Sequence, residues 1–162
     1  MVERTPMTTG SHKVLQEELH RLKTVERPKA SKAIEVARAH GDLSENAEYD
    51  AAKEAQGMLE ARIRDLESKL STAQVVDVSK LSGSKVVFGA TVLLSDVDSG
   101  DERSITIVGE DEADADRGLV SYNSPLARAV IGKSVDDIAK VRLPSGMKEY
   151  EILDVRFEEI GS

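Results

Sequence analysis

Apolar residues recur with helical spacing through the first half of the chain. Between residues 49 and 73 they are separated alternately by three and four positions, and only one member of the series is polar: Tyr49, Ala52, Gln56, Leu59, Ile63, Leu66, Leu70 and Ala73. An earlier segment gives a second series, on both sides of Pro28: Leu15, Leu19, Leu22, Ala30, Ala33, Ile34 and Ala37. This alternation is typical of the contact face between paired helices. The first half therefore predicts two helices that pack together.

Glycine and proline mark where these helices begin, bend and end. Pro28 lacks the N–H group that a helix interior uses, so we expect a kink there, and Thr8 or Thr9 can cap the start of the first helix. Gly41 is typical of a helix end, and Asp42 of the start of the next helix. Because so few residues join them, the two helices must run antiparallel.

The second half changes to the shorter period of β-strands. Two segments favour a hairpin around Pro144, and Ser124 and Pro125 favour the start of a helix. Strands are predicted over residues 86–94, with Gly89 as a candidate bulge, and over 104–108, 119–122, 140–143 and 149–157. The predicted fold class is therefore α+β. An antiparallel two-helix coiled coil occupies residues 1–78, and a small α/β domain with a mostly antiparallel sheet occupies residues 79–162.

Composition narrows the classes of function. The chain has no Cys, which excludes disulfides, thiolate zinc sites and a Cys nucleophile. No apolar run approaches the ~20 residues that span a bilayer, and the first residues lack the apolar stretch of a signal peptide, so we expect a cytoplasmic protein. Residues 76–162 hold 10 basic and 17 acidic residues, a net charge of −7, with nine of the acids between Asp96 and Asp116. Broad binding of free DNA or RNA needs a basic footprint and is not expected; the acidic run is interpreted as a solvated rim.

Asp42 and Glu45 stand three positions apart at the turn between the helices, and two interpretations stay open. In the first, they form a capping box that satisfies N–H groups of the second helix and opposes its dipole. In the second, the two carboxylates hold Mg²⁺, which takes few protein ligands, and a metal-bound water attacks a phosphodiester. The interpretations are compatible because a carboxylate has spare oxygens. Two exposed carboxylates do not hold Mg²⁺ tightly, so the second interpretation needs a partner that supplies the other ligands.

The run from His40 to Tyr49, His-Gly-Asp-Leu-Ser-Glu-Asn-Ala-Glu-Tyr, closely resembles the tip of the Gre transcript cleavage factors. The similarity covers nearly the whole chain in the same order, including residues 88–92, 107–114 and 123–133, and its pattern is that of the GreA type. The resemblance implies an FKBP-like second domain. It also implies an elongation factor whose hairpin enters the secondary channel of backtracked bacterial RNA polymerase. The polymerase then cuts the 3′ end of its own nascent RNA, so no independent catalysis by this chain is expected.

The resemblance also assigns roles to individual residues. Asp42 and Glu45 occupy the two acid positions of the family, which help to retain an Mg²⁺ ion shared with the polymerase active centre. Arg38 and Lys53 are candidates for a basic patch that contacts RNA phosphates, or else for an ordinary solvated face. Three neighbours of the acids are candidates for supporting the tip: Leu43, Asn46 and Tyr49.

Ser124 and Pro125 are implied, by the same resemblance, to help dock the second domain on the polymerase. Three other functions stay open: a channel-binding regulator that inhibits without cleavage, a folding helper with prolyl isomerase activity, and an oligomeric scaffold joined by intermolecular coiled coils. The Asp-x-x-Glu tip argues against the first, and the few aromatic residues argue against the second. The short turn between the helices argues against the third, so a monomer is expected.

Overall fold

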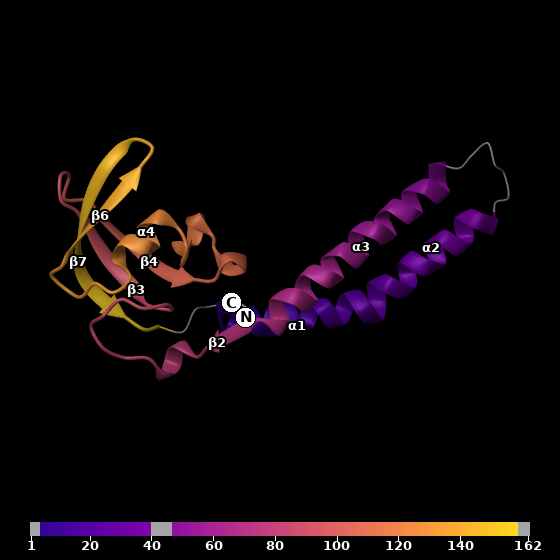
Figure 1. Cartoon of the computed structure of the whole chain (residues 1–162), viewed down its shortest axis with the longest axis horizontal. Coiled ribbons are helices and arrows are strands. Elements are labelled where there is room, and N and C mark those ends of the chain that lie inside the picture. Colours follow the sequence, from indigo (N-terminus) through magenta and orange to yellow (C-terminus); the bar gives the residue numbers. More distant parts are fainter. Residues whose placement is uncertain (1–3, 40–46, 159–162) are drawn as a thin grey trace. The chain divides into compact units, whose positions relative to one another are not determined.

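The computed structural model describes residues 4–39 and 47–158. Within these residues the chain forms two compact units, one of residues 13–72 and one of residues 4–12 with 73–158. The predicted α+β class is confirmed: a helical hairpin is followed by a curled, mostly antiparallel sheet (Figure 1). The predicted domain boundary between residues 78 and 79 stays a prediction. Among the described residues, no helix has the length and apolar character that crossing a membrane requires.

The first helical segment runs without a break from Thr9 to Ala39. It consists of α1 (Thr9–Arg21), a π-helical turn (Leu22–Glu26) and α2 (Arg27–Ala39). Thr8 caps its start, because the Thr8 Oγ1 accepts a hydrogen bond of 3.1 Å from the backbone N–H of Ser11. Where the sequence predicted a kink at Pro28, the structure has the π-helical turn directly before α2.

The second helix of the hairpin, α3 (Ala47–Ser71), lies alongside α2 (Figure 1). The predicted contact face is confirmed on α3, where Ile63 and Leu66 are 1% and 0% exposed and the other described members are half-buried. On the first segment Leu15, Leu22 and Ile34 are buried. Ala33 was wrongly included in this face, because it is exposed and Ile34 takes the inner position.

A two-stranded parallel sheet was not predicted. In it β1 (Thr5–Thr8) pairs with β2 (Ala73–Val76), so the residues directly before α1 and directly after α3 lie side by side. The hydroxyl of Thr8 also donates a hydrogen bond of 2.6 Å to the Glu112 carboxylate. These contacts make the N-terminal strand part of the same compact unit as the larger sheet.

The larger sheet has five strands in the order β5-β4-β3-β7-β6, and only the β4–β5 pair is parallel. Their bounds are Thr91–Asp96 (β3), Glu102–Val108 (β4), Leu119–Ser121 (β5), Ile138–Leu143 (β6) and Gly146–Arg156 (β7). The short helix α4 (Pro125–Val130) packs against the sheet (Figure 1). An aliphatic core joins them, with its central members 0–1% exposed: Val92, Leu94, Ile105, Ile107, Val130 and Ile152.

The strand predicted over residues 86–94 is wrong in its first half. The strand β3 begins only at Thr91, and the backbone N–H of Ala90 donates to the carbonyl of Val87 in a turn. Gly89 has φ +90°, a left-handed conformation that favours glycine, and it lies against the side chain of Val78. Gly89 therefore makes a turn and not a bulge. The hairpin predicted around Pro144 and the helix predicted after Ser124 are both confirmed.

Asp96 corrects the interpretation of the acidic run as a solvated rim. It ends β3 and is 8% exposed. Its carboxylate accepts hydrogen bonds from the backbone N–H groups of Asp98 at 2.9 Å and Ser99 at 3.3 Å, and pairs with Lys148 at 3.2 Å. The N–H of Asp98 first, and then Lys148 and Ser99, lower the pKa of Asp96. This acid is thus a structural part of the turn between β3 and β4.

Candidate functional site

Four of the predicted tip residues lie outside the described residues: Asp42, Leu43, Glu45 and Asn46. The structure describes the helix ends on either side of them. The first helical segment ends at Ala39 and α3 begins at Ala47, so residues 40–46 join the two. Along the chain, both acids are therefore within a few positions of the last turn of α2 and the first turn of α3.

Arg38 and Tyr49 contact each other across these two turns. The Arg38 Nη2 donates a hydrogen bond of 3.5 Å to the Tyr49 hydroxyl, and the guanidinium carbon lies 5.8 Å from the centroid of the Tyr49 ring. The second contact is a cation–π arrangement. Tyr49 is half-buried at the contact face, as predicted, while Arg38 is exposed. The pair joins the two helices at the end of the hairpin nearest the predicted tip.

Lys53 adds a second positive charge on the side of Tyr49. It follows Tyr49 by four positions on α3, and residues four apart share a face of a helix. The hydrogen bond from Arg38 lowers the pKa of the Tyr49 hydroxyl, with further lowering by the charges of Arg38 and Lys53. The charges of Arg38 and Lys53, one on each helix, thus both act on the Tyr49 hydroxyl. An anionic ligand beside Tyr49 would meet both of them.

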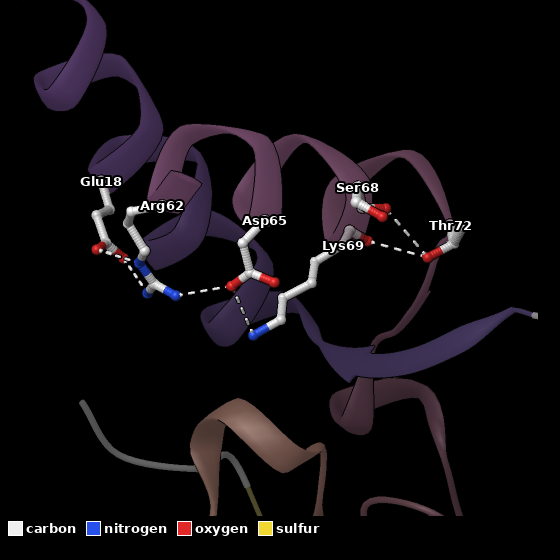
Figure 2. A network of polar contacts seen from close by, with 6 residues as sticks. All are labelled: Glu18, Arg62, Asp65, Ser68, Lys69 and Thr72. Atoms are coloured by element: carbon white, nitrogen blue, oxygen red, sulfur yellow. Dashed lines mark hydrogen bonds and ion pairs between the residues drawn. The ribbon is translucent and has the colours of Figure 1, made fainter. Parts of the chain in front are cut away.

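Ion pairs join the first helical segment to α3 along the rest of the hairpin, among them Lys23–Glu67 at 2.9 Å, Arg27–Glu60 at 2.7 Å and Glu18–Arg62 at 2.9 Å. Figure 2 shows that Arg62 also reaches Asp65, which in turn pairs with Lys69. Exposed pairs of this kind stabilise a protein only slightly. Their main effect here is to fix which residues of the two helices lie opposite each other.

The Arg27–Glu60 pair is bidentate, because the Arg27 Nε also donates to the same carboxylate at 3.0 Å. This hydrogen bonding raises the pKa of Arg27 and lowers the pKa of Glu60. Both groups therefore stay charged at neutral pH. A planar pair with two hydrogen bonds has a defined geometry. The direction of the Arg27 side chain therefore reports how the start of α2 is rotated relative to α3.

Ser124 and Pro125 lie at the start of α4. The Ser124 Oγ accepts a hydrogen bond of 3.2 Å from the backbone N–H of Ala127, and Pro125 is the first helical residue and exposed. Both residues line a pocket of about 240 Å³, whose other walls are Arg103, Val120, Leu126, Val141, Leu143 and Tyr150. This volume is below the ~300–1,000 Å³ of most ligand sites. The pocket is therefore small for a cofactor.

Within residues 4–39 and 47–158 there is no group of three or more His, Asp or Glu side chains that could hold a metal ion. The carboxylates of Asp42 and Glu45, which lie outside these ranges, are the donor type that Mg²⁺ prefers. The sequence alone did not reveal the Arg38–Tyr49 contact or the pocket beside Ser124.

Comparison with known proteins matches both halves of the chain. Residues 5–75 match the family described as transcription elongation factor, N-terminal, and residues 81–157 match transcription elongation factor, GreA/GreB, C-term. The transcription elongation factor GreA of Hyphomonas neptunium is 56% identical over 97% of this chain and 100% of its own length. GreA of Caulobacter sp. is 55% identical, over 96% of this chain and 99% of its own.

Among solved structures, GreA factor homolog 1 of Thermus thermophilus is 27% identical, covers 95% of this chain and 99% of its own, and has a TM-score of 0.45. The two family matches together cover most of the sequence, and the named relatives align over nearly their full length. The chain therefore belongs to the GreA/GreB family of transcription elongation factors and is of the GreA type.

Proposed function

We propose that this chain enters the secondary channel of bacterial RNA polymerase and stimulates the polymerase's own cleavage of backtracked RNA, which rescues arrested complexes. The observation that carries the proposal is the pair Asp42 and Glu45, which lies in the link between the two helices of the hairpin in a chain of the GreA type. The partners are then the polymerase and the 3′ end of its nascent RNA. The chain acts as a monomer in the cytoplasm.

The helical hairpin has the properties that such a carrier needs. The helix α3 has 25 residues, so it is about 37 Å long at ~1.5 Å per residue. Near residues 40–46 the contact face contains the half-buried small side chains of Ala37 and Ala52, together with the ring of Tyr49. Small side chains let two helices approach closely, so we expect this end of the hairpin to be narrow. A long, narrow element suits a channel.

Asp42 and Glu45 would act by binding and orienting. Their carboxylate oxygens would contribute ligands to an Mg²⁺ ion that the polymerase also holds. When bound, such an ion supplies charge stabilisation and an activated water for phosphodiester hydrolysis. Two carboxylates are too few to hold it alone, so the polymerase must complete the site. The chain by itself is therefore not a nuclease.

The basic pair beside the tip and the pocket on the second unit would hold the RNA and the polymerase. Arg38 and Lys53 present two positive charges beside Tyr49, which suits the phosphates of an extruded RNA. Ser124 and Pro125, at the edge of an apolar pocket, suit a polymerase side chain docked outside the channel. The second unit would then hold the chain on the polymerase, and the hairpin would carry the two acids that take part in cleavage.

The test uses a stalled, backtracked polymerase carrying RNA labelled at its 3′ end. With Mg²⁺ and this chain, labelled short fragments should be released much faster than with Mg²⁺ alone. The chain with free RNA and Mg²⁺ should release none. Inhibition of elongation without cleavage would instead identify a channel-binding regulator, and cleavage of free RNA would identify a nuclease.

A further inference from the structure

The contact face of the first helical segment changes phase by one residue along its length. Leu15, Leu19 and Leu22 face inward, and in a regular α-helix this spacing would continue at positions 26, 29, 33 and 36. In the structure the inward positions are instead 30, 34 and 37, each one residue later than a regular helix would give. Ala30, Ile34 and Ala37 are half-buried or buried, whereas three of the residues that a regular helix would place there are exposed: Lys29, Ala33 and Val36.

The π-helical turn between α1 and α2 produces this change. The backbone N–H of Arg27 donates to the carbonyl of Leu22, five positions back, where an α-helix uses four. Arg21 and Arg27, on either side, both have α-helical dihedral angles, so the helix continues through the turn. One extra residue in a turn rotates every later side chain by about 100° relative to a regular helix. The phase change is therefore a one-residue insertion.

Pro28 explains why the insertion occurs here. Proline has no N–H, and in a regular α-helix its ring would collide with the carbonyl four positions back, that of Thr24. A wider turn directly before the proline removes this collision. The hydroxyl of Thr24 donates a hydrogen bond of 2.8 Å to the carbonyl of His20, which supplies a donor inside the irregular turn. Pro28 thus favours the π-helical turn, and the hydroxyl of Thr24 forms a hydrogen bond within it.

The rotation decides which side chain of α2 meets Tyr49. Without the extra residue, the direction that Arg38 now takes would belong to Ala37, and Arg38 would point about 100° away. The bidentate Arg27–Glu60 pair would be lost in the same way, because Arg27 also lies beyond the insertion.

We propose that the π-helical turn is a positioning device that rotates α2 by one residue, so that Arg38 and not Ala37 faces Tyr49 beside the tip. Its consequence for RNA cleavage rests on the proposed function, but the rotation itself does not. Pro28 and Ile34 are the two residues that hold it. Pro28 excludes the regular helix, and Ile34 is the large apolar side chain that is buried only in the rotated state.

The rotation can be measured by disulfide formation, because the chain has no cysteine of its own. Val36, Ala37 and Ala52 all line one groove between α2 and α3, but Ala37 and Ala52 are half-buried whereas Val36 is 47% exposed. The double variant Ala37→Cys/Ala52→Cys should therefore form its disulfide faster than Val36→Cys/Ala52→Cys. In the background Pro28→Ala/Ala33→Ile/Ile34→Ala, which favours a regular helix, the order should reverse.

The same triple variant separates positioning from stability. It should bind the polymerase as the unmodified chain does, while RNA cleavage falls about 10- to 100-fold because Arg38 is turned away. An unchanged disulfide preference in the triple variant, or a reversed preference with full cleavage, would overturn the proposal. If the unmodified chain stimulates no cleavage at all, the proposed function fails, and the disulfide preference still decides the rotation.

A second variant covers the case in which the triple variant does not fold. Deleting Val25 together with Pro28→Ala removes the extra residue and the proline that requires it. This variant should keep the original contact face, and with it the disulfide preference for positions 37 and 52 in the original numbering. Loss of that preference in a folded deletion variant would show that the turn is not a one-residue insertion.

Discussion

Replacing Gly109 with alanine should loosen the N-terminal strand from its place beside the larger sheet. Gly109 is buried and has φ −74°, which any residue adopts, so the substitution introduces no backbone strain. A Cβ at this position would lie 2.9 Å from the carbonyl oxygen of Pro6 and 3.6 Å from the Cα of Met7. Ordinary contacts of a Cβ begin at 3.4 Å, so the shortfall is 3.4 − 2.9 = 0.5 Å. Because the nearest atom belongs to the backbone, β1 itself must move.

The magnitude follows from two opposing effects. Forcing an extra methyl group into a packed site costs about 1–3 kcal/mol. The alanine also reduces the conformational entropy of the unfolded chain, which raises the free energy of unfolding by about 0.4–1 kcal/mol. The net loss of unfolding free energy should be about 1–2 kcal/mol. Movement of β1 should also lengthen the hydrogen bond between Thr8 and Glu112, which is 2.6 Å in the structure.

Urea unfolding and amide hydrogen exchange measure this change. Exchange should accelerate in β1 and β2 before it does so in the five-stranded sheet. Gly57→Ala is the matched control, because its Cβ would meet nothing within 4 Å and it lies inside α3, where alanine gains about 0.8–1 kcal/mol over glycine. If Gly109→Ala is as stable as the unmodified chain and exchange in β1 is unchanged, the strand does not pack on Gly109 as described.

Three further predictions concern the hairpin and the sheet. Leu66→Ala, at a fully buried position, should lower the free energy of unfolding by about 2–5 kcal/mol, measured by thermal unfolding with circular dichroism. Met58→Ala, at a 70% exposed position, should change it by no more than about 0.5 kcal/mol. Equal losses would contradict the assigned contact face. Tyr49→Phe removes the oxygen that accepts from Arg38 and should lower polymerase-dependent RNA cleavage about two- to fivefold without changing the melting temperature; unchanged cleavage would make the hydrogen bond irrelevant. Because the pKa of Asp96 is lowered in the folded state, its charge stabilises the fold at pH values above the ordinary carboxyl pKa of about 3.9, and this stabilisation disappears as the pH falls through the lower folded pKa. Asp96→Asn should therefore be less stable than the unmodified chain at pH 7, and the difference in unfolding free energy should shrink in acid. A difference that is the same at all pH values would contradict the role of the Asp96 charge.

The elements that the sequence predicted well are those whose signal is local. The alternation of three and four positions in α3 records directly which side chains are buried, and Ile63 and Leu66 are at its centre. Ser124 followed by Pro125 predicts the start of α4, because a capping hydroxyl and a fixed φ act on their own turn. The hairpin around Pro144 is equally local.

The features that were missed depend on residues far apart or on a change of helix type. Pairing of β1 with β2 joins segments separated by the whole hairpin, and neither strand has a strong pattern of its own. Ala33 was assigned to the contact face together with Ile34, because apolar spacing after the expected kink did not distinguish them; after the π-helical turn Ile34 is buried and Ala33 is exposed. Gly89 was read as part of a strand, although its φ of +90° makes a turn.

The candidate site was predictable only in part. The positions of Arg38 and Lys53 on opposite helices followed from the antiparallel arrangement, but the contact of Arg38 with Tyr49 depends on the rotation of α2, which the sequence spacing alone did not reveal. Likewise, Ser124 and Pro125 were singled out by resemblance, and their place at the edge of an apolar pocket depends on the packing of α4 against the sheet.

In the proposed function, Asp42 and Glu45 serve the chemistry of the polymerase and not merely the folding of the turn. The most direct measurement compares RNA release from a backtracked polymerase with the double variant Asp42→Asn/Glu45→Gln and with the control Asp50→Asn/Glu54→Gln, which removes the same two charges further along α3. The first variant should lose nearly all stimulation while it keeps its affinity for the polymerase, and the control should stay active. Normal stimulation by Asp42→Asn/Glu45→Gln would contradict it.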